Sequence, residues 1–236
     1  MDGSGRLFDP LVQVLAEHPV AREWEIQVCA YPPDSVLDYA RLEGDVRAVL
    51  PVNEPFVLLG ESFSGPIAVS LAAGLLEAGN PHLKGVVLCC SFIRPPRHVP
   101  VSIAAGFFRL FPAHRFFSDL SGYFLFGRWI TRPLLALLAE ALAPVSPAVL
   151  SARISAVLSV DVSARLARCA EGGRLPLLYL QANQDRVVPS GVLKIIRQYA
   201  PAISVVRLSG PHCLLQTQPW QACDVLVRFV QDNAGK

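Results

Sequence analysis

The chain of 236 residues carries little charge for its size, and this scarcity excludes several classes of protein. Charged residues make up 17% of it and hydrophobic residues 52%, and the net charge is only +2. A disordered chain needs the opposite balance, so the composition predicts a compact globule with a large core. Because no basic block alternates with aromatic residues, we expect no nucleic-acid partner.

Long apolar runs and cysteine motifs are also missing. The most apolar stretches, residues 99–111 and 133–150, are broken by charges and prolines before reaching the roughly 20 residues of a spanning helix. Residues 1–6 have no basic segment followed by an apolar one, so we expect no signal peptide. The six cysteines form no CxxC pair and show no metal-ligand spacing. We therefore expect a cytoplasmic protein without stable membrane insertion.

Segments typical of strands and of helices alternate along most of the chain. Strands are predicted at residues 24–31, 56–59, 85–92, 175–181 and 203–208, and helices at residues 7–18, 39–50, 66–78, 190–199 and 219–230. Such alternation predicts an α/β fold with a doubly wound, mostly parallel sheet.

Residues 94–169 interrupt this alternation. They hold many phenylalanines among several prolines, which indicates a helical cap inserted into a core formed by residues 1–93 and 170–236. The alternative is that most of these phenylalanines only pack the interior of the cap helices.

A serine lies on the turn between the strand at residues 56–59 and the helix that follows. Ser62 has Gly60 two residues before it and Ser64 two residues after it. This pattern is typical of a nucleophile elbow, in which small flanking residues are needed because the strand and helix backbones pass close together. Ser64 stands where glycine is more usual. The alternative is that Ser62 merely caps the helix.

At these residues the chain resembles the α/β-hydrolase family, and the resemblance implies that an acid and then a histidine follow the serine. Asp185 lies in the loop after the strand at residues 175–181, similar to the position of the family's acid. His212 lies in the loop after the last strand, similar to the position of its histidine, and the other four histidines occupy no such place. For Asp185 the alternative is a cap for the next helix.

The resemblance implies a reaction without a metal or an organic cofactor. Ser62 attacks as the nucleophile, His212 takes its proton, and Asp185 orients the imidazole. The backbone N–H of Phe63 is one of the two donors that the oxyanion needs.

The N-terminal part departs from the family. Residues 1–8 look like the loop after the family's third strand, but that strand is absent, and its loss would leave a gap between the strands at residues 24–31 and 56–59. We expect either that the sequence is a shortened form of a longer enzyme or that the sheet closes over the gap. Met1 falls where the second oxyanion donor belongs, and losing one donor costs about 3 kcal/mol of transition-state stabilisation.

The residues together predict a serine hydrolase. Its substrate would be a small-molecule ester or thioester with an apolar group, because the expected cap is rich in apolar residues. Two alternatives remain: an acyltransferase that uses the same three residues, and a binding protein whose catalysis is impaired by the missing strand. The oligomeric state is not indicated.

Overall fold

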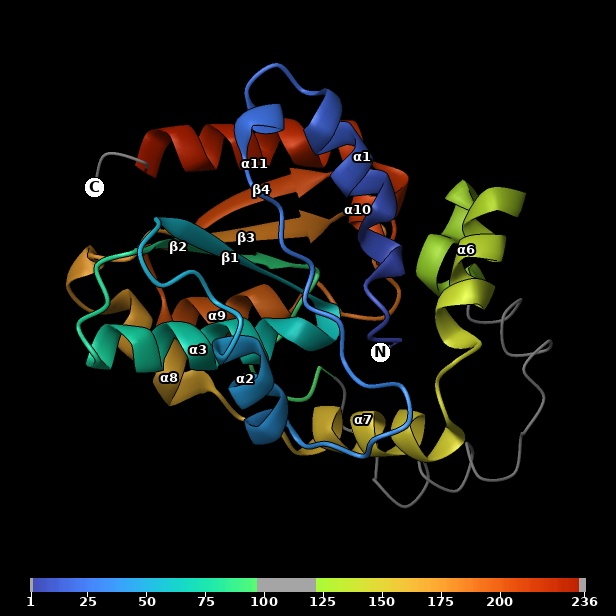
Figure 1. Ribbon diagram of the computed structural model, residues 1–236, viewed down its shortest axis with the longest axis horizontal. Coiled ribbons are helices and arrows are strands. Elements are labelled where there is room, and N and C mark those ends of the chain that lie inside the picture. Colours follow the sequence, from blue (N-terminus) through green and yellow to red (C-terminus); the bar gives the residue numbers. More distant parts are fainter. Residues whose placement is uncertain (1, 97–121, 234–236) are drawn as a thin grey trace.

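A four-stranded parallel sheet forms the centre of the computed structural model, which describes residues 2–96 and 122–233 (Figure 1). Its strands lie in the order β1-β2-β3-β4. They are β1 (Phe56–Glu61), β2 (Leu83–Cys89), β3 (Leu177–Ala182) and β4 (Ser204–Leu208). The prediction of an α/β fold with a parallel sheet is confirmed.

Helices cover both faces of the sheet (Figure 1). On one face lie α1 (Asp9–Glu17) and α11 (Pro219–Asn233). On the other lie α2 (Tyr39–Arg47), α3 (Gly65–Glu77), α8 (Ser163–Ala170) and α9 (Val192–Tyr199). Successive β2 residues alternate between the two cores: Val87 packs with α1 and α11, and Val86 with α3, α8 and α9. Because both of their faces are buried, the two inner strands, β2 and β3, are mostly apolar.

The prediction of a strand at residues 24–31 is wrong. This segment is irregular in the structure, and Ile26 and Val28 remain 39% and 38% exposed. An alternating pattern predicts an extended chain, but a strand also needs a neighbouring strand to bond with, and β1 pairs only with β2. Within the described residues β1 is therefore an edge of the sheet, and no gap opens in the middle of it.

Between β2 and β3 the described chain is helical. A short helical segment at residues 122–126 precedes α6 (Arg132–Leu142) and α7 (Pro147–Ser159), and α8 follows. Residues 97–121, which include several phenylalanines of the predicted cap, lie outside the described residues. In α8, Leu166 and Cys169 pack into the core beside α3.

Among the described helices none is both long and apolar enough to cross a membrane alone. The pair α6 and α7 has the length and composition together, but the two helices bend by 99° where they meet.

Candidate active site

The turn after β1 is tight and holds Ser62 in an unusual backbone conformation. A short 3-10 helix, η3 (Ser62–Ser64), links β1 to α3, and the φ angle of Ser62 is +49°. A side chain on Gly60 would place its Cβ 2.7 Å from the Cα of Gly65, so the two backbones do pass closely. A residue other than glycine at positive φ is uncommon and marks a constrained turn.

Two hydroxyl groups brace this turn from neighbouring segments. Ser91 Oγ donates a hydrogen bond of 2.7 Å to the Ser62 carbonyl, and Tyr31 Oη donates one of 2.9 Å to Ser64 Oγ. The serine that replaces the more usual glycine therefore accepts a hydrogen bond that glycine could not.

Three side chains far apart in the sequence form one hydrogen-bonded row at the carboxyl ends of the strands. His212 Nε2 lies 2.8 Å from Ser62 Oγ, and His212 Nδ1 lies 2.9 Å from Asp185 Oδ2. The His212 and Asp185 side chains are only 5% and 7% exposed. The imidazole is thus held between a hydroxyl group and a carboxyl group, shielded from solvent.

The second oxygen of Asp185 has its own partners. Its Oδ1 accepts hydrogen bonds of 2.8 Å from the backbone N–H groups of Val187 and Val188. Because α9 begins only at Val192, Asp185 is not the N-cap of that helix. The loop instead orients the carboxyl group so that its other oxygen faces the imidazole.

Of the two predicted oxyanion donors, only Phe63 lies among the described residues. Phe63 lies in η3 directly after Ser62, and its ring is buried and stacked on Tyr39 with centroids 4.7 Å apart. Met1 lies outside the described residues.

A buried cation that the sequence did not reveal joins the N-terminal loop to α7 and to the segment around Pro32. Arg153, in α7, is 2% exposed and donates hydrogen bonds of 2.7 Å to the Asp2 carbonyl and 2.9 Å to the Pro32 carbonyl. In addition, Tyr31 N donates to the Gly3 carbonyl at 2.6 Å. No local pattern signals these contacts, because Arg153 and Asp2 are 151 residues apart in sequence.

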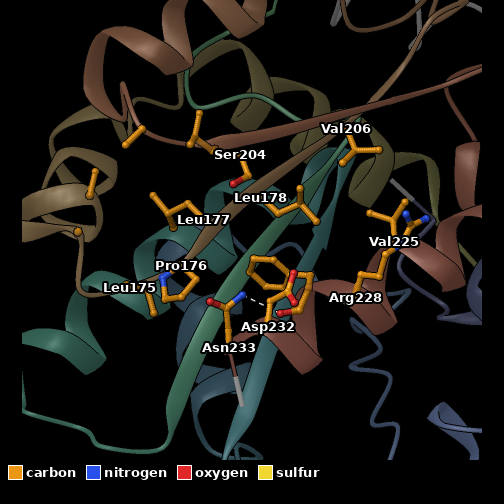
Figure 2. A pocket seen from close by; sticks show the side chains of 15 residues that line it. Leu175, Pro176, Leu177, Leu178, Ser204, Val206, Val225, Arg228, Asp232 and Asn233 are labelled. Atoms are coloured by element: carbon orange, nitrogen blue, oxygen red, sulfur yellow. Dashed lines mark hydrogen bonds between the residues drawn. The ribbon is translucent and has the colours of Figure 1, made fainter. Parts of the chain in front are cut away.

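A pocket of about 510 Å³ lies away from the three residues, between β3, β4 and α11 (Figure 2). Its walls are mostly apolar, and Arg228 and Asp232 add charged groups. Because it contains none of Ser62, Asp185 and His212, the hydrogen-bonded row and not this pocket defines the candidate site. In residues 2–96 and 122–233 no cluster of His, Cys, Asp and Glu could hold a metal ion, and all six cysteines are free.

Known structures share this fold. A hydrolase from Oleispira antarctica matches with a TM-score of 0.80 and 14% identity, over 99% of this chain and 89% of its own. A bromoperoxidase from Bacillus anthracis matches with 0.75 and 17%, over 97% and 88%. An esterase from Rhodococcus sp. ECU1013 matches with 0.73 and 20%, over 98% and 88%. No family model and no curated protein matches the sequence. The chain has the α/β-hydrolase fold.

Proposed function

We propose that the chain is a serine hydrolase that cleaves carboxylic esters or thioesters through an acyl-enzyme. The observation that carries the proposal is the hydrogen-bonded row from Ser62 through His212 to Asp185, with Ser62 on a turn of positive φ. A fold alone does not define a reaction, and the structural neighbours include a bromoperoxidase as well as esterases. The argument therefore rests on the site.

Each of the three residues has a distinct task in the proposed reaction. Ser62 Oγ attacks the acyl carbon while His212 Nε2 takes the hydroxyl proton. The Asp185 carboxylate accepts a hydrogen bond from Nδ1–H, which selects the tautomer that leaves Nε2 free to act as the base. His212 then gives the proton to the leaving alcohol or thiol. Water, activated by the same imidazole, releases the acid and restores Ser62.

The negative charge on the tetrahedral oxygen needs backbone donors. The N–H of Phe63 is the proposed first donor, because it follows the nucleophile directly. The proposed second donor is Met1.

We infer further that, of the predicted cap at residues 94–169, the part that precedes α8 lies over the site, whereas α8 packs into the core. We also infer that the substrate carries an apolar group. Two contacts near the proposed catalytic residues support this. Cys213, next to His212, donates its backbone N–H to the Leu125 carbonyl at 3.0 Å. The Arg186 guanidinium, next to Asp185, lies 4.5 Å from the centroid of the Tyr123 ring. An apolar segment beside both loops favours an apolar acyl or alcohol group.

Labelling with a fluorophosphonate probe tests the proposed function, because the probe reacts only with an activated serine. We expect labelling of the wild-type chain, its loss in Ser62→Ala, and a rate lowered by about 10³-fold or more in His212→Ala. Absence of labelling in a folded wild-type chain would favour a binding protein.

A further inference from the structure

The carboxyl group of Glu61 is buried directly before the proposed nucleophile, and it lacks a partner for one oxygen. In the described parts of the chain, two buried side-chain atoms have no hydrogen-bond partner: Glu61 Oε1 and Gln216 Oε1. Such atoms are rare in folded proteins, because an unpaired buried polar group lowers stability. Two of them at one place therefore require an explanation.

The two oxygens belong to side chains that already share a hydrogen bond. Gln216 Nε2 donates to Glu61 Oε2 at 3.1 Å and to the Leu7 carbonyl at 3.0 Å. The Leu7 carbonyl can only accept, so it fixes which end of the amide carries the nitrogen. Both amide hydrogens are then used. If Glu61 were ionised, the two remaining oxygens could both only accept, and neither could satisfy the other.

A proton on Glu61 removes this conflict. The neutral acid can donate from Oε1 to Gln216 Oε1 while Oε2 accepts from Nε2, which gives a pair joined by two hydrogen bonds. Burial raises the pKa of Glu61 from its ordinary value of 4.5 to about 7, against the opposing effects of the Gln216 hydrogen bond and of His212. Asp2 and three buried thiols, those of Cys89, Cys90 and Cys213, also interact electrostatically with Glu61.

We propose that Glu61 is a positioning residue that, as a neutral acid paired with Gln216, fixes the segment carrying Ser62 against the segment carrying His212. Gln216 lies in α10 (Leu214–Thr217), which begins two residues after His212. Gln216 also donates to the Leu7 carbonyl, so it contacts the segment that follows the N-terminal loop. The pair thus ties together the end of β1, the start of α10 and this segment. This inference rests on the proposed roles of Ser62 and His212.

The stability of wild type and Glu61→Gln as a function of pH tests the charge state. Glutamine imitates the neutral acid, because its amide can donate to Gln216 Oε1 and accept from Nε2. The pKa of Glu61 is higher in the folded chain than in the unfolded chain. The contribution of neutral Glu61 to the free energy of unfolding is therefore fully present below about pH 4.5, and it is lost as the pH rises through about 7. We expect the urea midpoint of wild type, relative to Glu61→Gln, to fall across this window.

The exposed Glu54 provides a matched control, since Glu54→Gln should give a curve parallel to wild type. Parallel curves for wild type and Glu61→Gln would overturn the proposal, because the pKa of Glu61 would then be the same in the folded and the unfolded chain. This readout needs no catalysis, so it remains valid if the fluorophosphonate experiment fails.

Kinetics tests the positioning role. Glu61→Ala and Gln216→Leu should each lower kcat by about tenfold to a hundredfold with KM changed by less than about threefold, since small displacements of reacting groups cost this much. Glu61→Gln should recover kcat to within about threefold of wild type. An unchanged kcat in folded Glu61→Ala would contradict the proposal.

Discussion

At the scale of single residues, the site depends on how His212 is held. Its Nε2 lies 2.8 Å from Ser62 Oγ, and its Nδ1 lies 2.9 Å from Asp185 Oδ2. In the proposed mechanism Nδ1 donates a hydrogen bond to the carboxylate and Nε2 accepts one from the hydroxyl. A neutral imidazole can do both only in one tautomer, which the carboxylate selects.

We expect Asp185→Asn to lower kcat by about 10⁴-fold while KM changes little, because an amide can favour the wrong tautomer without altering the shape of the site. Rates of ester hydrolysis for the purified variant measure this. A decrease of less than about tenfold would show that Asp185 does not orient the imidazole.

The sequence could predict that these three side chains meet, because each follows a segment whose pattern predicts a strand of a parallel sheet. Their catalytic roles stay predictions. It could not predict the residues that brace them. Tyr31 meets Ser64 across 33 residues, and Gln216 meets Glu61 across 155. Contacts at such separations depend on the folded chain, and no local spacing encodes them.

At the scale of elements, the crossing of β1 and α3 determines the geometry of the turn. The close passage at Gly60 leaves no room for a side chain, whereas Gly44 in α2 has nothing within 4 Å of the place where a Cβ would lie.

Replacing these two glycines with alanine should change the stability of the fold in opposite directions. Gly60→Ala should destabilise the fold by about 2 kcal/mol or more, because the added carbon meets backbone atoms that cannot move apart cheaply. Gly44→Ala should stabilise it by about 0.5–1 kcal/mol, because alanine favours a helix interior. Urea denaturation of both variants measures the difference, and equal effects would refute the close crossing.

Helix α7 contributes through one buried cation. Arg153→Met should lower the free energy of unfolding by about 2–3 kcal/mol, because the Asp2 and Pro32 carbonyl oxygens lose a charged donor. The exposed Arg165, paired with Glu43, is the control, and Arg165→Met should cost less than about 1 kcal/mol. Similar losses in the two variants would mean that Arg153 does not fasten the N-terminal loop.

The sequence predicted strands correctly where helices bury both faces of an apolar segment. It failed at residues 24–31, where the outcome depends on a neighbouring strand to pair with. Residues 56–59 and 175–181 are apolar runs that correspond to β1, at an edge of the sheet, and to β3, in its interior, and helices cover both faces at each. Residues 24–31 alternate as a strand should, but pairing depends on a neighbour that one segment cannot specify. This is why the predicted gap in the middle of the sheet is not found.

At the scale of the whole molecule, one α/β core brings the loops after β1, β3 and β4 to the same edge of the sheet. Parallel strands place all their carboxyl ends together, and this edge is where such folds bind ligands. The segment at residues 122–126 lies beside two of these loops.

If this segment belongs to a cap with an apolar wall, substrate preference should follow chain length. Across p-nitrophenyl esters from acetate to palmitate, we expect kcat/KM to rise from acetate to a longer chain, at about 0.8 kcal/mol for each CH₂ group that becomes buried. Acetate as the best substrate, with longer chains excluded, would contradict an apolar pocket.

The most direct test of the central claim is the mass of the chain trapped during turnover of a p-nitrophenyl ester and mapped by peptide digestion. The account predicts one acyl group, attached to Ser62, absent in Ser62→Ala and accumulating much more slowly in His212→Ala. Rapid ester cleavage with no acyl group on Ser62, or with the group on another residue, would contradict it.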